Sequence, residues 1–154
     1  MASVTVKFEV VGSLDKYAEI FDEQARAAMT EACLREQAAV QRNAPEYSGT
    51  FASSIEIDVS TDAGMTRGDV YSTDSEAKVA VIEGGRRPGG SFPNISALSG
   101  WARAKGIPVF LAARAIAVEG IAPRRVFGRS ADETEAEVDQ ILMVDLPDSI
   151  IGSL

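Results

Sequence analysis

The chain has 154 residues but no histidine, and its single cysteine is Cys33. Without histidine it lacks the commonest general base, the commonest metal ligand and any Ser–His or Cys–His nucleophile. One cysteine cannot form an internal disulfide, which favours a reducing compartment. No apolar run approaches the roughly 20 residues that cross a bilayer. The N-terminus also lacks the basic region and apolar core of a signal peptide. These absences argue against most enzymes, disulfide scaffolds and membrane proteins.

Known nucleotide-binding patterns are absent as well. The glycine-rich stretch VIEGGRRPGG, residues 81–90, lacks the GxxxxGK[ST] spacing of a phosphate-binding loop. It also fails the GxGxxG spacing of dinucleotide-binding folds and does not lead directly into a helix. Two interpretations of the loop stay open: a mobile surface loop rich in turn formers, or a loop ordered by a partner. Paired arginines supply fork-shaped donors for a carboxylate or phosphate.

Charge is unevenly distributed along the chain. The net charge is −8, yet residues 84–129 hold eight basic residues and one acidic residue, Glu119, which gives this segment +7. Residues 1–83 carry −8 and residues 130–154 carry −7. Such a chain is not typical of a general nucleic-acid binder, but its oppositely charged segments suit head-to-tail docking. The residues we expect to bind a partner are Arg86, Arg87, Arg124, Arg125 and Arg129.

The N-terminal third predicts a strand followed by a long helix. Alternating apolar residues predict a strand over residues 3–11, and Gly12 ends it. No glycine or proline interrupts residues 14–43, where helical spacing brings together Leu14, Tyr17, Phe21, Ala25, Ala28, Ala32 and Leu34. Its alanine-rich face can pack against the chain's own sheet or against a helix of a neighbouring subunit. Pro45 ends the helix.

The rest of the chain predicts a hairpin and several short helices. We expect strands over residues 55–59 and 70–73, joined by a turn-rich loop, TDAGMTRGD. Residues 76–83 fit helix or strand. Further helices are expected over residues 95–105, capped near Asn94 or Ser96, over 110–118, ended by Gly120, and over 131–144, ended by Pro147. Residues 121–130 should form a basic connector.

These elements predict one α+β domain, in which a small antiparallel sheet packs with one long N-terminal helix and several shorter C-terminal helices. The predicted parts are the N-terminal strand and helix (3–43), the hairpin (53–73), the loop (84–93), the C-terminal helices (95–144) and a tail (145–154).

Carboxylates are plentiful, but their patterns resemble solvated surfaces. Glu56 and Asp58 share one strand face, and the last helix is crowded with acids. Asp58, Asp62 and Asp69 could offer oxygen ligands to Mg²⁺ or Ca²⁺, but no EF-hand spacing supports this. We expect no catalytic residue, no metal and no cofactor. Cys33 is expected to be a small packed residue.

Three short motifs occur in a definite order. An Ala-Pro step at residues 44–45 precedes SGTFASSI at 48–55, AVIEGG follows at 80–85, and Gly120, Pro123 and Phe127 come before the last helix. In this order, over roughly residues 14–144, the chain resembles the tail-completion or neck proteins of long-tailed bacteriophages, small head–tail joining proteins also described as minor tail components. It departs from their pattern at Ser48, Phe51 and Lys78–Val79, and lacks a threonine after the Glu-x-Gly element. The motif of Gly120, Pro123 and Phe127 is also one residue longer than the commonest spacing.

The resemblance implies a non-enzymatic virion protein at the head–tail junction, made in the host cytoplasm. Such subunits surround the DNA channel as a ring, here of about six copies. They contact other neck or tail proteins (a connector, a tail terminator or the tail tube). Genome DNA would pass without sequence-specific binding, and no membrane is involved. The alternative is a nucleic-acid-binding protein that uses residues 84–129. Within the ring, we expect Arg86 and Arg87 to pair with acids of an adjacent subunit.

Overall fold

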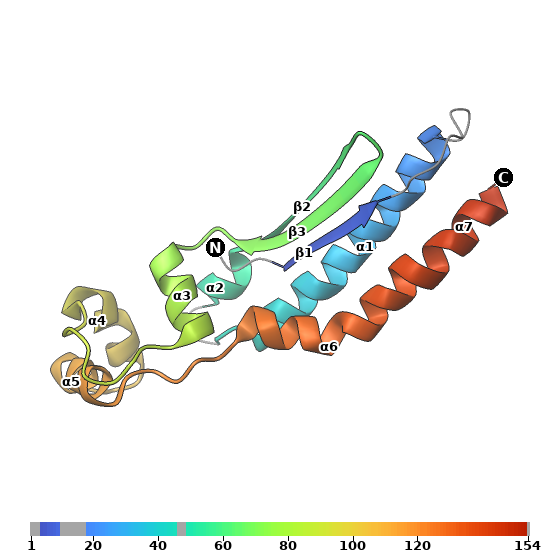
Figure 1. Ribbon diagram of the computed structural model, residues 1–154. Helices are drawn as coiled ribbons and strands as arrows, with labels where there is room; N and C mark the ends of the chain where they lie inside the picture. The colour runs from blue at the N-terminus through green and yellow to red at the C-terminus, as the bar shows by residue number, and fades with distance from the viewer. Residues whose placement is uncertain (1–3, 10–17, 46–48, 154) are drawn as a thin grey trace. The chain divides into compact units, whose positions relative to one another are not determined.

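A computed structural model describes residues 4–9, 18–45 and 49–153 (Figure 1). The chain divides into two compact units. Met1–Asp74 and Val126–Leu154 form the first, which we call the sheet unit, and Ser75–Arg125 form the second, the inserted unit. The single domain expected from chain length stays a prediction, which cooperative unfolding of the two units together would confirm.

The sheet unit contains a three-stranded antiparallel sheet. Its strands are β1 (Val4–Glu9), β2 (Ile55–Asp62) and β3 (Met65–Ser72), in the order β1-β3-β2. Ala63 and Gly64 turn between β2 and β3 with φ angles of 49° and 78°. Positive φ at two successive residues is the signature of the tight hairpin turn that matches strand twist. The predicted loop over residues 61–69 was therefore wrong, because most of it is strand.

Helix α1 (Ala18–Asn43) packs on this sheet, as one of the two interpretations of its alanine-rich face proposed. Gly68 of β3 permits the contact: a Cβ there would lie 2.4 Å from the Cys33 Sγ and 2.8 Å from the Met29 Cγ. The buried stripe of α1 is Ala25, Met29, Ala32, Cys33, Glu36, Ala39 and Val40. Leu34, expected on that face, is 49% exposed. The predicted helix start at residues 14–17 lies outside the described residues.

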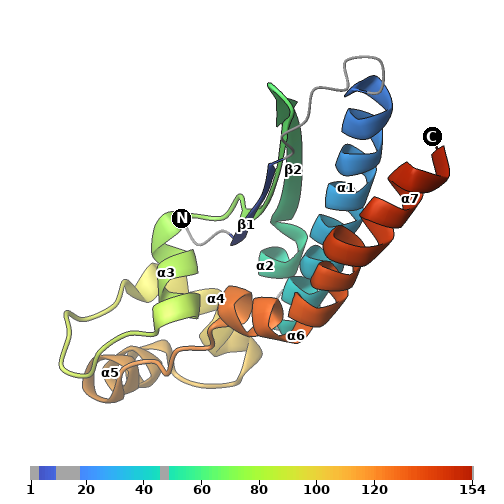
Figure 2. The same cartoon turned by 45° about the vertical axis from the view of Figure 1, so that its right-hand side comes forward.

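The C-terminal helices cover the other side of α1. They are α6 (Val126–Gln140), a π-helical segment η2 (Ile141–Asp145) and α7 (Leu146–Ser153). In both views α1 lies between the sheet and these helices (Figures 1 and 2). The short helix α2 (Thr50–Ser53) contributes Phe51, whose ring meets Phe127 of α6 edge-on, with centroids 6.4 Å apart.

Two predictions about this C-terminal region were wrong. Residues 126–130, expected in a connector, begin α6, and Pro147 does not end the helix but is the second residue of α7. Proline has no backbone N–H, and the first residues of a helical segment do not need one for the helix's own hydrogen bonds. The preceding π-helical turn has already changed the hydrogen-bonding pattern, since the Leu146 N–H donates to the Ile141 carbonyl.

Three helices make up the inserted unit: α3 (Glu76–Gly84), α4 (Ile95–Ala104) and α5 (Val109–Glu119). Asn94 caps α4 by accepting a hydrogen bond from the Ser96 N–H, as predicted. Gly120 ends α5, also as predicted. With its small antiparallel sheet, long N-terminal helix and shorter later helices, the protein has the predicted α+β fold.

Candidate functional site

The glycine–arginine loop is held by its own chain. Arg86 forms an isolated antiparallel bridge with Ile121: the Arg86 N–H donates to the Ile121 carbonyl at 2.8 Å, and the Ile121 N–H donates back at 2.9 Å. The Gly89 N–H donates to the Ala117 carbonyl at 2.8 Å, and the Arg124 N–H to the Ile82 carbonyl at 2.9 Å. Residues far apart in the sequence thus hold the start of the loop through backbone hydrogen bonds.

Two glycines make this crossing possible. Gly85 and Gly120 have φ angles of 71° and 77°, with ψ angles of −166° and −161°. Only glycine populates this backbone region readily. A Cβ on Gly120 would lie 2.2 Å from the Arg86 carbonyl oxygen, and one on Gly85 would lie 2.4 Å from the Ile121 carbonyl oxygen. We call this crossing the glycine clamp.

The predicted partner-binding arginines are divided between the two units. Arg86 is half-buried, and its guanidinium donates to the Ser91 carbonyl and hydroxyl oxygens. Arg87, Arg124 and Arg125 are exposed in the inserted unit, and Arg125 has a positive φ of 49°. Arg129 belongs to the sheet unit.

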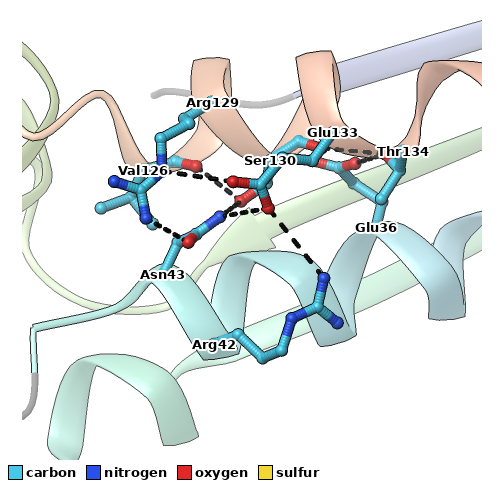
Figure 3. A network of polar contacts seen from close by, with 8 residues as sticks. All are labelled: Glu36, Arg42, Asn43, Val126, Arg129, Ser130, Glu133 and Thr134. Carbon is cyan, nitrogen blue, oxygen red and sulfur yellow. Dashed lines mark hydrogen bonds and ion pairs between the residues drawn. The ribbon is translucent and has the colours of Figure 1, made fainter.

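Arg129 takes part in a polar network that joins the end of α1 to the first turns of α6 (Figure 3). It donates to the Asn43 side-chain oxygen and forms an ion pair with Glu133 at 3.4 Å. Asn43 donates to the Ser130 hydroxyl at 3.0 Å and to Glu133 at 2.9 Å. The charged groups are half exposed, so these ion pairs contribute little stability individually. The Arg129 guanidinium therefore already has partners within the subunit, Asn43 and Glu133.

A half-open cavity of about 300 Å³ lies in the sheet unit, between α1, β3 and the α6–η2 helix. Its apolar lining includes Cys33, Gly68, Val70 and Leu142, and α6 adds Asp132, Glu135 and Asp139. Spacings of three and four residues place these acids on one side of α6. The cavity thus combines an apolar lining with an acidic edge.

Glu36 also lines this cavity and is 4% exposed. Thr134 donates to one carboxylate oxygen, while the other, Oε1, has no hydrogen-bond partner in the described chain. Burial raises the Glu36 pKa, the Thr134 hydrogen bond opposes that shift, and Glu133 adds to it. Burial likewise raises the pKa of the Cys33 thiol to about 11, so the thiolate that reactive cysteines need is suppressed.

The other carboxylates considered from sequence lie on the surface of the sheet. Glu56 and Asp58 are exposed on the outer face of β2. Asp58 and Asp69 are opposite in register, but Asp69 forms an ion pair with Arg67 at 2.9 Å. Within the described ranges, no group of three or more His, Cys, Asp or Glu side chains is placed to hold a metal ion.

The inserted unit exposes seven large apolar side chains. Its exposed large apolar side chains are Phe92, Ile95, Ile107, Phe110, Leu111, Val118 and Ile121. On α5, the buried residues Ala112 and Ala113 occupy one side, while Phe110, Leu111 and Val118 are 57%, 53% and 63% exposed on the other. Contiguous exposed apolar patches mark interaction sites in soluble proteins.

Charge divides between the units. The inserted unit holds eight basic and three acidic residues, a net charge of +5, whereas the sheet unit holds seven basic and 20 acidic residues, a net charge of −13. The sequence pattern suggested this polarity.

The apolar side of α5 and the buried Glu36 were not predicted from the sequence. Glu36 does fall at helical spacing from Ala32 and Ala39, on the stripe of α1 that faces the core.

Fold and surfaces together define a small α+β protein whose charge and exposed apolar groups are divided between two units. A family model, the HK97-gp10-like bacteriophage tail component, matches residues 8–94, more than half of the chain. The protein belongs to this family of phage tail components, which places it with virion proteins. The motif of Gly120, Pro123 and Phe127 lies outside the matched residues. Neither the curated proteins nor the solved structures contain a match. No helix in the described part of the chain has the length and hydrophobicity needed to cross a membrane.

Proposed function

We propose that the protein is a tail-completion or connector subunit at the phage head–tail junction, and that copies of it form a ring around the DNA channel. The observation that carries the proposal is the division of charge, −13 on the sheet unit and +5 on the inserted unit. A ring requires two different surfaces on each subunit, because each copy contacts its neighbours head to tail. Opposite charges on those surfaces set orientation and suppress wrong pairings.

Three further features support this role. The inserted unit exposes apolar side chains that a neighbouring protein would bury. The glycine clamp fixes the basic loop on a rigid base, which lowers the entropic cost of binding. The acidic sheet unit repels DNA phosphates, as suits a channel through which genome DNA passes without being held. Assembly would take place in the host cytoplasm, and the finished ring would remain in the virion with other neck or tail proteins.

Labelling purified virions tests this proposal. An epitope tag at the C-terminus, visualised with gold-conjugated antibody, should mark the junction between head and tail. Quantitative mass spectrometry of the same virions should give a small multiple of subunits per particle, about six for a single hexameric ring. Label at the distal tail tip, or absence of the protein from virions, would contradict the proposal.

The basic inserted unit also supports a second candidate, a DNA-binding protein that uses residues 84–129. One of the basic residues of this segment, Arg129, already pairs with Glu133. Phosphate contacts make such binding strongly salt-dependent. In an electrophoretic mobility-shift assay, the purified protein should then bind a DNA fragment at low salt and release it at physiological salt. Absence of a shift at low salt would eliminate this candidate.

A further inference from the structure

The outward side of α5 forms a single apolar stripe that contains one positive charge. At 100° per residue, Phe110, Leu111, Arg114 and Val118 fall within an arc of about 100°. Phe92 extends the stripe, because its ring lies against Phe110 with centroids 5.7 Å apart. Arg114 is exposed amid these apolar groups. We call this surface the α5 stripe.

The cavity of the sheet unit has complementary properties. Cys33, Gly68, Val70 and Leu142 give it an apolar lining. Glu135 and Asp139 lie exposed along its α6 edge. The unpartnered Glu36 carboxylate oxygen adds an acceptor among the lining residues. An apolar occupant that also brings a cation would satisfy all of these groups.

We propose that the α5 stripe of one copy docks into this cavity of the next copy, with Arg114 against the acidic edge of α6. Phe110 and Leu111 would enter the apolar part of the cavity, and the guanidinium would pair with Glu135. The contact is heterologous, since the stripe and the cavity are different surfaces, so repetition of it generates a ring or a filament. This inference rests on the proposed function and identifies the surfaces that would join its subunits.

Charge exchange between Arg114 and Glu135 is the test. Self-association of the full-length wild-type protein is measured by sedimentation velocity, alongside Arg114→Glu, Glu135→Arg and the double variant. Each single reversal places like charges together and should weaken association by about tenfold or more, whereas the double variant restores the opposite pair and should recover most of it. Phe110→Ser should weaken association without changing any charge.

Matched controls carry the same changes away from the two surfaces. Arg103→Glu reverses an exposed charge on α4, and Glu137→Arg reverses one on α6 that does not line the cavity. Ile151→Ser removes an apolar side chain that is 69% exposed on α7. All three controls should associate like the wild type. Circular dichroism and thermal unfolding should show that every variant is folded.

The outcomes separate this inference from the function on which it rests. If the wild type associates but Arg114→Glu and Glu135→Arg behave like their controls, the docking surfaces are wrong while a ring remains possible by other contacts. If the double variant is as weak as the singles, the pairing is wrong. If the wild type stays monomeric at high concentration and in chemically cross-linked virions, the ring itself is contradicted.

Discussion

Replacing Gly120 by alanine tests the glycine clamp, the contact that holds the basic loop. A Cβ at this position would lie 2.2 Å from the Arg86 carbonyl oxygen, 2.9 Å from the Pro88 nitrogen and 3.1 Å from the Arg87 carbonyl carbon. All three obstacles are backbone atoms, so no side chain can rotate away. The residue also has φ 77° and ψ −161°, a conformation that alanine rarely adopts.

Gly106 provides the matched control. It too follows a helix of the inserted unit and has a positive φ of 67°, but nothing lies within 4 Å of its added Cβ. Gly106→Ala should therefore cost only the conformational penalty, about 1 kcal/mol. Gly120→Ala adds the overpacking of a rigid contact, which brings the expected cost to about 3 kcal/mol.

Urea unfolding and amide hydrogen exchange provide the measurement. Gly120→Ala should lower the unfolding free energy more than Gly106→Ala does. It should also speed exchange at the Arg86 and Ile121 amides, whose hydrogen bonds form the bridge. Equal destabilisation by the two substitutions, with unchanged exchange at these amides, would refute the clamp.

Three further predictions concern the interior of the sheet unit and the basic loop. Gly68→Ala should lower the free energy of unfolding by about 2 kcal/mol, because the new methyl group meets the Cys33 sulfur. The double variant Gly68→Ala, Cys33→Ala should lose less stability than the sum of the two single variants, and strict additivity would show that the contact is absent. Glu36→Gln should stabilise the fold by about 1 kcal/mol at pH 7. Burial raises the folded pKa of Glu36 above 4.5, so the stability contributed by its neutral form is complete below that pH and is lost as pH rises through the folded value. The advantage of glutamine should therefore shrink toward pH 4 in thermal unfolding scans, and an advantage independent of pH would contradict this cause. Reversing both Arg86 and Arg87 to glutamate should impair particle assembly while leaving the melting temperature within about 2 °C of the wild type, because the backbone clamp does not use their charge. If this variant assembles as well as the control variant Arg26→Glu, the two arginines do not contact a partner.

Local sequence signals predicted the elements whose causes are local. Alternation predicted the strands, Asn94 and Gly120 marked helix ends, and uninterrupted helical spacing predicted α1. The hairpin was misjudged because Gly68 and its charged neighbours resemble a loop. The reason for that glycine is the approach of Met29 and Cys33 from a helix more than 30 residues away in sequence.

The candidate site was less predictable because it depends on tertiary contacts. The glycine clamp joins the backbone segments near residues 85 and 120. No local sequence pattern shows which glycines lie where two distant backbone segments meet. Apart from Arg114, the run VFLAARAIAV is apolar on all sides, so the spacing of its apolar residues could not identify the exposed side of α5. Arg129 was grouped with the basic connector, although it lies in α6 and pairs with Glu133 one turn later.

The most direct test of the central claim is electron microscopy of lysates from phage that lack this gene, with and without the wild-type gene supplied on a plasmid. A subunit that joins head to tail predicts filled heads and separate, complete tails in the deletion lysate, and joined, infectious particles after complementation. Intact particles that remain infectious without the protein would contradict the account.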